Sequence, residues 1–415
     1  MLLDELAGVG RDARTGGYER LVLSSAELEL REWFLARAAA LGLDAETDGN
    51  GNLWAWAGPP GPGTLLLGSH LDSVRGGGAF DGPLGVASAF AALERLQGAG
   101  IALRRPVAIV AFADEEGGRF GIACAGSRLL TGALPAERAL ALRDVDGISL
   151  GEAASAVGLD PRRYGADPAR LALIGEAIEL HIEQGHLPVE AGGGHAHAPV
   201  AGGAAAGLAE AASPLGVATA IWPHGRWRLE FAGAANHAGT TPLAARRDPL
   251  LPLANAVLEL RGAAERHDAL ATIGRVEVEP GAVNAIAAAA RAWVDARGAD
   301  EARIRRVIRD LARATGLPPV EESWTAETRF DRELTDAVAE LVAPVAGLAS
   351  GAAVPRLPSG AGHDAGVLAL AGIPTAMLLV RNPTGVSHAP GESAEDADVE
   401  LGVLALAEVV RGRAA

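Results

Sequence analysis

The sequence predicts an α/β protein of two domains, in which a smaller α+β domain interrupts the main one. Three observations support this fold class. Strand and helix patterns alternate up to about residue 210, which is typical of an α/β sheet. From about residue 224 the pattern changes to that of a compact α+β unit. The stretch "GIPTAMLLV" (372–380) then returns to the buried-strand pattern of the first part, so the main domain resumes after an insertion.

The main domain opens with a helix, two strands, a second helix and another strand. Apolar residues recur at helical spacing over 25–43, after a serine that can cap the helix. Strands at 52–58 and 63–70 flank the turn "GPPGPG". The helix that follows ends at Gly98, and "RPVAIVAFADEEGG" is the next buried strand.

The inserted domain shows its own succession of strands and helices. It comprises strand 227–233, helix 246–264, strands near 271–279 and 286–297, helix 301–315 and a strand near 319–328. After it, "RELTDAVAELVAPVAG" is a helix of the main domain. We therefore assign 1–222 and 331–415 to the main domain and 223–330 to the inserted one.

Composition narrows the function classes. The chain has 415 residues, 49% hydrophobic and 21% charged, with a formal net charge of -16. This acidic balance disfavours nucleic acid and anionic membrane surfaces as partners. The single cysteine, Cys124, excludes an internal disulfide and fits a reducing compartment. We see no signal peptide and no apolar stretch long enough for a membrane span, so we expect a cytoplasmic protein.

Four apolar strands each end in side chains that bind metals. They deliver His70 and Asp72, Glu115 and Glu116, His181 and Gln184, and His388, and Asp81 joins them from the loop before a helix. Sites in open α/β sheets form beyond the carboxyl ends of the strands, where scattered residues converge. Imidazole and carboxylate ligands suit Zn²⁺ or a similar divalent ion. Strand alternation places Asp72 on the same side as His70, so that Asp72 can orient this ligand through its second ring nitrogen.

Each of these residues also has a simpler explanation. A lone histidine is more often structural, a Glu–Glu pair is usually solvated, and Asp81 can cap the next helix. Their joint occurrence at four strand ends favours a metal site. The Gly/Ala-rich segment 191–212 is typical of a flexible surface insertion, in which His195 and His197 can bind metal only adventitiously.

The ordered set of motifs resembles a known family over about residues 20 to 410. The motifs are "GSHLDSV", "GGAFDGPLGV", "DEEGGRFG", "HIEQG", "NHAGTTP", "SGAGHDA" and "SHAPGE". They resemble the amidase branch of the dinuclear zinc-peptidase superfamily, which contains N-carbamoyl-L-amino-acid hydrolases, allantoate amidohydrolases and β-ureidopropionases. The resemblance implies a mixed-sheet, phosphorylase/hydrolase-like catalytic domain with a ferredoxin-like inserted domain that serves as lid and dimerisation domain.

The resemblance also implies a metal centre and a homodimer. Two divalent ions, Zn²⁺ or Mn²⁺ with Co²⁺ or Ni²⁺ possible, are bridged by Asp81. One ion also binds His70 and His181, and the other binds Glu116 and His388. Glu115 is the general base. Adjacent glutamates diverge where they leave a strand, which agrees with this division of roles.

Substrate contacts follow from the same resemblance. They are Gln184, His237, Asn284, Arg297 and His363, with Asp364 nearby. Arg297 suits a substrate carboxylate, although by itself it is typical of a surface ion pair. His237 is also expected to be catalytic, as a hydrogen-bond donor to the oxyanion of the tetrahedral intermediate, and to reach the partner's active site across the dimer. The chain departs from the family at Ala287, where proline is common, and in its insertion at 191–212.

The sequence therefore predicts a metal-dependent amidohydrolase of a small carbamoyl- or ureido-substituted acid. The first hypothesis is an N-carbamoyl-L-amino acid, cleaved to the amino acid, CO₂ and ammonia. Allantoate or ureidoglycolate is the alternative within the class. A peptidase or N-acyl amino-acid hydrolase of the parent superfamily is disfavoured by His181, where that superfamily usually has an acidic ligand. A non-catalytic binding protein is disfavoured by Glu115, because a binder needs no base.

Overall fold

A computed structural model describes residues 2–185, 207–346, 348 and 352–415, so His195 and His197 lie outside the described residues. The described chain forms two compact units. Unit 1 comprises 2–185, 207–221 and the described part of 329–415, and unit 2 comprises 222–328. The predicted boundaries lie within two residues of these. No helix among the described residues is both long and apolar enough to cross a membrane.

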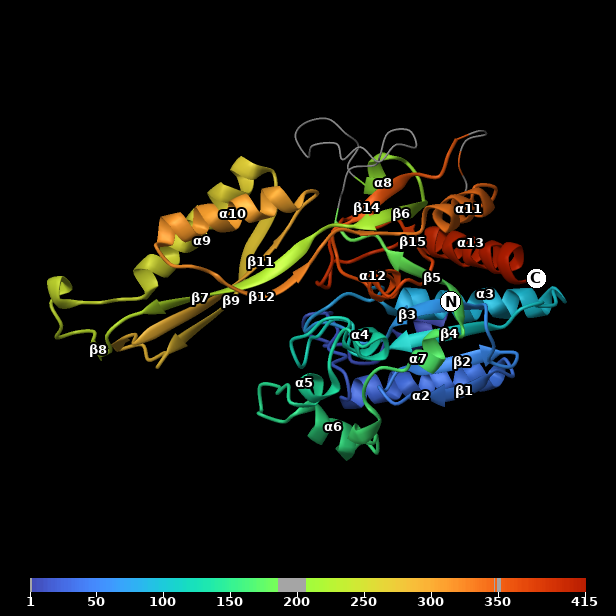
Figure 1. Ribbon diagram of the computed structural model, residues 1–415, viewed down its shortest axis with the longest axis horizontal. Helices are drawn as coiled ribbons and strands as arrows, with labels where there is room; N and C mark the ends of the chain where they lie inside the picture. The colour runs from blue at the N-terminus through green and yellow to red at the C-terminus, as the bar shows by residue number, and fades with distance from the viewer. Residues whose placement is uncertain (1, 186–206, 347, 349–351) are drawn as a thin grey trace. The chain divides into compact units, whose positions relative to one another are not determined.

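Unit 1 is built on a large mixed sheet (Figure 1). In spatial order its strands are β1 (Asp44–Thr47), β2 (Leu53–Ala57), β4 (Val107–Phe112), β3 (Thr64–His70), β5 (Ile174–Ile182), β15 (Thr375–Val380), β6 (Leu215–Ile221) and β13 (Thr328–Arg329), while β14 (Arg356–Ser359) pairs with β6. The central strands β4, β3, β5 and β15 run parallel to their neighbours in this group. Their carboxyl ends therefore meet at one edge of the sheet.

Helices cover both faces of this sheet. Along β3, Leu65 and Leu67 belong to one hydrophobic core and Leu66 to another, as the two-residue period of a strand requires. The longer helices of unit 1 are α2 (Ser25–Ala40), α3 (Pro83–Gly98), α11 (Arg332–Val342) and α13 (Asp396–Ala414), and all four pack into the first core. The shorter ones are α1 (Leu2–Leu6), α4 (Ala125–Thr131), α5 (Ala136–Leu140), α6 (Leu150–Ala156), α7 (Pro168–Leu171), α8 (Gly207–Glu210) and α12 (Asp364–Leu370).

Unit 2 is a four-stranded antiparallel sheet with two helices and a short two-stranded ribbon. The sheet order is β12 (Val320–Thr325), β7 (His224–Ala232), β11 (Ala289–Arg297) and β9 (Leu270–Glu279); the helices are α9 (Leu250–His267) and α10 (Glu301–Thr315); the ribbon pairs β8 (Asn236–His237) with β10 (Ala285–Ile286). The helix predicted over 246–264 begins four residues later, because Pro249 disfavours helical backbone in the residue before it. The strand predicted over 286–297 divides because its two parts pair with different strands.

Candidate metal centre

The sheet delivers its polar side chains to the shared carboxyl edge. His70 is the last residue of β3, and His181 is the next to last of β5. Glu115 and Glu116 follow β4, and His388 lies in the loop after β15. Because these strands are parallel, the residues that follow them gather on one side of the sheet.

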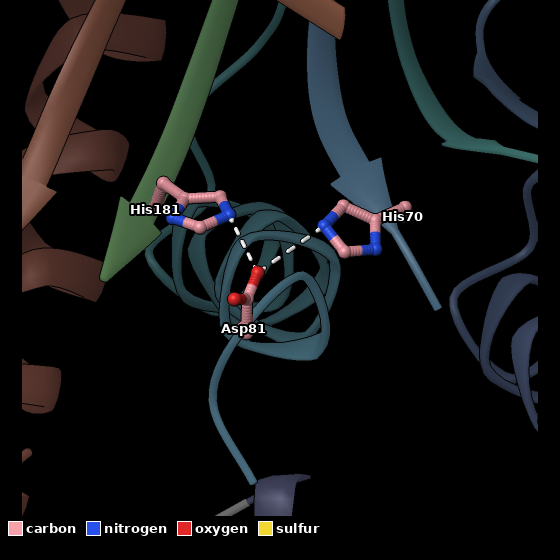
Figure 2. A group of neighbouring side chains, drawn as sticks. All are labelled: His70, Asp81 and His181. Atoms are coloured by element: carbon pink, nitrogen blue, oxygen red, sulfur yellow. Dashed lines mark ion pairs between the residues drawn. The ribbon is translucent and has the colours of Figure 1, made fainter. Parts of the chain in front are cut away.

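The first group of possible metal ligands is His70, Asp81 and His181, all buried (Figure 2). Asp81 Oδ1 lies 3.5 Å from His70 Nε2 and 3.1 Å from His181 Nε2. The opposite ring nitrogens face main-chain carbonyl oxygens, at 3.1 Å for His70 and 2.8 Å for His181. If each Nδ1–H donates to its carbonyl, a neutral ring presents the lone pair of Nε2 toward Asp81, which is how a ligating histidine is usually oriented.

The second group shares Asp81 with the first. It comprises Asp81, Glu116 and His388, and within each group the ligand atoms lie within 4.8 Å of one another. His388 Nε2 is 3.4 Å from Asp81 Oδ2 and 3.3 Å from Glu116 Oε2. The two oxygens of Asp81 thus face different groups, as a bridging carboxylate requires. The alternative that Asp81 caps α3 is wrong, because Gly82 occupies the N-cap position and makes no side-chain cap.

A third set of close ligand atoms, Glu179, His181 and His363, serves a different role. Both oxygens of Glu179 already accept hydrogen bonds, from Ser69 Oγ at 2.7 Å and from the Ala365 main chain at 2.9 Å. His363 Nε2 lies 2.8 Å from Ser359 Oγ, and the His363 ring packs edge-on against that of His181, with centroids 4.5 Å apart. In this set, the Glu179 carboxylate is occupied by hydrogen bonds, and the His363 ring supports the ring of His181 by packing against it.

Glu115 is held between the first group and a residue that the sequence analysis missed. Its Oε2 lies 3.8 Å from His70 Nε2, and its Oε1 accepts a hydrogen bond from the Cys124 thiol at 3.3 Å. Asp72 accepts from the main-chain N–H groups of Glu115 and Glu116, both at 3.1 Å. The Asp72 carboxylate lies 3.7 Å from His70 Nδ1, so the nearer contact of that ring is the Asp72 carbonyl.

The electrostatics of the centre fit divalent cations. Burial raises the pKa of Glu115 well above its usual range. Burial alone would raise the pKa of Asp81, but the adjacent rings of His181 and His70 hold it well below the usual range. Burial alone would lower the pKa of His388, because its charged form is cationic, but the contact with Glu116 raises this pKa to about 9. Among the described residues, His70 Nε2 and Glu116 Oε1 are buried without a hydrogen-bond partner. The centre has an excess of buried carboxylates and also offers imidazole nitrogens as metal ligands. This set of side chains is chemically suitable for two divalent cations.

Two of the predicted substrate contacts lie beside the metal groups. Gln184 Nε2 donates to Asp81 Oδ2 at 2.6 Å and to Ser387 Oγ at 3.0 Å. His363 contacts His181 as described above. The structure thus brings Gln184 and His363 to the edge that carries the ligands, while their action on a substrate stays a prediction.

The other three predicted contacts lie in unit 2. His237 pairs with Ala285 in the β8–β10 ribbon, and the Ala238 N–H donates to the Asn284 carbonyl at 3.0 Å, so His237 and Asn284 are neighbours. The Gly239 N–H donates to His237 Nδ1 at 3.0 Å, so the tautomer that accepts this bond carries its ring proton on Nε2. Arg297 ends β11 and makes a two-pronged ion pair with Asp295, at 2.8 Å for each bond.

Comparison with known proteins identifies the class. A family model described as Peptidase family M20/M25/M40 matches residues 66–412, so this chain belongs to that family. Its large mixed sheet is consistent with the hydrolase fold of the family, and the family implies a dinuclear site for divalent metals, for which the two groups above are candidates.

The individual relatives are amidohydrolases. The N-carbamoyl-L-amino acid amidohydrolase of Geobacillus stearothermophilus is 33% identical, over 98% of this chain and 96% of its own length. The allantoate amidohydrolase of Escherichia coli (strain K12) is 31% identical, over 97% and 94%. The crystal structure of an amidase of the hydantoinase/carbamoylase family from Burkholderia vietnamiensis matches with a TM-score of 0.85 and 29% identity, over 100% of this chain and 96% of that one.

These findings confirm the resemblance to the amidase branch that the motifs predicted. They also support the prediction of an enzyme: the chain is a hydrolase that acts on C–N bonds of amides.

Proposed function

We propose that this protein hydrolyses N-carbamoyl-L-amino acids to the amino acid, CO₂ and ammonia, using two divalent ions, Zn²⁺ or Mn²⁺. The observation that carries the proposal is the position of Asp81, whose two oxygens face two ligand groups beside Glu115. The similarity to an N-carbamoyl-L-amino acid amidohydrolase over nearly the whole chain supports the substrate class.

The proposed roles follow from the contacts. Asp81 would hold both ions, with His70 and His181 as further ligands of one and Glu116 and His388 as further ligands of the other. Two ions held there would supply an activated water and stabilise the charge that develops on the attacked carbonyl group. Glu115 takes the proton from the attacking water and passes it to the leaving nitrogen. The raised pKa of Glu115 suits both halves of that transfer. Asp72 positions Glu115 and Glu116 by accepting hydrogen bonds from their main-chain N–H groups.

The carbamoyl bond is cleaved with a balanced outcome. Water adds to the carbamoyl carbon, the C–N bond to the terminal or the substituted nitrogen breaks, and the resulting carbamic acid decomposes. The products are one amino acid, one CO₂ and one ammonia for each water consumed. Gln184 and His363 are proposed to hold the substrate at the main-domain edge, and Arg297 to hold its carboxylate.

Ammonia release from a substrate panel tests the proposal. The panel contains N-carbamoyl-L-amino acids of several side chains, allantoate, ureidoglycolate and N-acyl amino acids, with the chain reconstituted in Zn²⁺, Mn²⁺, Co²⁺ or Ni²⁺. We expect the highest kcat/KM with an N-carbamoyl-L-amino acid and none after chelation. Glu115→Gln is the control for contaminating activity. Full turnover by the metal-free protein, or turnover of N-acyl amino acids alone, contradicts the proposal.

Allantoate is the second candidate substrate. The observation that favours it is that a relative named allantoate amidohydrolase is nearly as similar, at 31% identity over 97% of this chain. Allantoate also carries a carboxylate and a ureido group, so the same side chains suit it. A higher kcat/KM for allantoate than for every carbamoyl amino acid in the panel would assign this function instead.

We further propose that the active enzyme is a homodimer formed through unit 2. Helix α9 exposes Leu251 and Leu258, at 72% and 73%, one heptad apart and thus on one face. Strand β9 is an edge of its sheet and exposes Val276 and Val278; edge strands of this kind readily pair with another chain. A second copy of unit 2 would cover both features.

The distance between His237 and Arg297 in unit 2 connects this dimer with catalysis. His237 lies in the ribbon next to the Ala289 end of β11, whereas Arg297 lies at the other end. Eight residues of strand separate these ends by about 27 Å, which no small substrate spans. If both side chains serve the reaction, they act on different active sites, and we propose that His237 reaches the partner's site.

Complementation tests the shared site. His237→Ala and Glu115→Gln homodimers are each expected to be nearly inactive. After subunit exchange, one site of the mixed dimer combines an intact Glu115 with an intact partner histidine, so activity should return toward one quarter of wild type at equal mixing. A mixture that stays inactive, although mixed dimers are shown to form, assigns His237 to its own chain or to no catalytic role.

A further inference from the structure

One buried carboxylate links the two loops that carry Asp81 and His388. Glu392 Oε1 accepts hydrogen bonds from the main-chain N–H groups of Phe80, at 2.8 Å, and Asp81, at 3.0 Å. Glu392 lies four residues after His388, and its own N–H closes a turn onto the Ala389 carbonyl at 3.1 Å. Glu392 therefore joins the backbone of the Asp81 loop to the short turn that follows His388, in addition to the Ser387 hydroxyl, which donates to Asp81 Oδ2 at 3.3 Å.

The contact requires a glycine on the opposite loop. A Cβ at Gly78 would lie 2.2 Å from Glu392 Oε1 and 2.6 Å from Glu392 Cβ. No real Cβ approaches so closely, so any larger residue at 78 displaces the Glu392 carboxylate. Gly78 does not have a positive φ, so the backbone conformation does not require glycine there. The close approach of the other loop explains why the run "RGGGAF" has glycine at position 78.

We propose that Glu392 is a positioning residue that sets the distance between Asp81 and His388, and that it thereby controls the affinity of the second metal group without comparable effect on the first. The inference rests on the dinuclear site of the proposed function. Glu392 is not itself a ligand in either group, and its role is exerted through the backbone that carries Asp81 and through the turn that carries His388.

The selectivity follows from how each group is supported. His70 and His181 belong to β3 and β5, which pair with each other and with further strands. Their relative position is fixed by the sheet whether or not Glu392 is present. His388 lies in a loop, has a left-handed backbone with φ 57 and exposes about half of its side chain, 49%. Loss of the Glu392 contacts loosens Asp81, which both groups share. In the first group the other two ligands stay framed by strands, whereas in the second the loop of His388 is loosened as well, so the second group should lose more affinity.

Metal titration of the full-length chain tests this. The metal-stripped protein is dialysed against graded Co²⁺ and, separately, Zn²⁺, and the bound metal per chain is measured together with circular dichroism. We expect the ion of the second group, whose ligands lie in loops, to be the weaker of the two. Glu392→Ala should raise its Kd at least roughly tenfold, as is typical when a residue supporting a ligand is lost, and should change the Kd of the tighter ion less than about threefold. Gly78→Ala should act in the same direction, because it displaces the same carboxylate.

Matched variants separate position from charge and from general destabilisation. Glu392→Gln retains Oε1, the only oxygen that makes these contacts, since Oε2 has no hydrogen-bond partner in the described part of the chain; it should bind both ions nearly as wild type does. Glu400→Ala removes an equally charged residue that pairs with Arg95 at the surface. Gly98→Ala adds a methyl group where no atom lies within 4 Å. Both controls should leave the two affinities unchanged.

The outcomes are distinguishable. If Glu392→Ala weakens both ions equally, or weakens neither while it is folded, the proposal is wrong. If Glu392→Gln behaves as Glu392→Ala does, charge rather than position controls the second ion, and the proposal is also wrong. If Glu392→Ala does not fold, Gly78→Ala against Gly98→Ala decides. Wild type that binds fewer than two ions contradicts the dinuclear assignment itself, independently of Glu392.

Discussion

The two metal groups use the same kinds of side chain but rest on different supports. The first is built from two histidines at the ends of paired strands, and both rings are about 1% exposed. The second takes Glu116 and His388 from loops, and His388 is half exposed. Only Asp81 belongs to both. The difference indicates that the sheet fixes the ligand side chains of one group, whereas the other depends on loop contacts and is more exposed to solvent.

Removing the shared carboxylate should have the largest effect, because it breaks both groups at once. Asp81→Ala leaves each ion with one ligand fewer and removes the anion between two like charges. We expect kcat/KM to fall by roughly a thousandfold or more, as when a member of a catalytic unit is deleted. Bound metal per chain and ammonia release measure the effect. Retention of two ions with substantial activity would show that Asp81 is not the bridge.

Substitutions of the adjacent glutamates provide the next test, because the loss of Glu115 should affect kcat and the loss of Glu116 should affect metal binding. Glu115→Gln keeps the metal groups and removes the base, so kcat should fall by roughly 10²–10⁴-fold with both ions still bound. Glu116→Gln should instead weaken the second ion, and raising the metal concentration should restore part of the activity. If the two variants exchange these behaviours, the roles of the pair are reversed.

The sequence predicted that these side chains gather at the strand ends, because that information is local. An apolar run followed by His or Glu marks both a buried strand and its carboxyl end, and parallel pairing then brings His70, His181 and Glu116 to one edge. The supporting contacts were not predictable in this way. Glu392 acts on Asp81 across 311 positions, and no period or spacing in the sequence indicates such a pair.

Local backbone geometry accounts for the remaining differences. Asp72 was expected to orient His70 with its carboxylate, but the chain leaves strand geometry after His70, and the Asp72 carbonyl lies closer to the ring. Cys124 was used only to argue about disulfides. Its contact with Glu115 arises where 113–115 and 124–126 lie side by side through three main-chain hydrogen bonds, a pairing that needs the folded turn between them.

The pH dependence of metal binding sharpens the comparison. In the metal-free protein the pKa of His388 is raised to about 9, and those of His70 and His181 are raised as well. Below these pKa values each imidazole carries a proton that an ion must displace. The second group loses one such proton, so its affinity should fall by about tenfold per pH unit below 9. The first group contains two histidines of raised pKa, so its affinity should fall more steeply once both are protonated.

Titrations at pH 6.5, 7.0 and 7.5 measure the two slopes. Calorimetry in buffers of different ionisation enthalpy counts the released protons directly. His388→Ala is the control, because it should abolish the pH dependence of the second ion and leave that of the first. Equal slopes for the two ions in wild type would contradict the assignment of two histidines to one group and one to the other.

The smallest effect is expected at Cys124, which touches the proposed base but neither metal group. Its thiol donates to Glu115 Oε1 at 3.3 Å, and its main-chain N–H donates to the Glu115 carbonyl at 2.6 Å. The thiol contact directs Oε2 toward His70. Loss of one hydrogen bond costs about 1 kcal/mol, so Cys124→Ala should lower kcat by about fivefold while KM and both metal affinities stay unchanged.

Cys124→Ser is the matched variant, since both substitutions occupy the same left-handed backbone, φ 55, and differ only in the donor. We expect Cys124→Ser to recover most of kcat. If alanine and serine reduce kcat equally, the thiol acts through its volume, and Glu115 is positioned by its main chain alone.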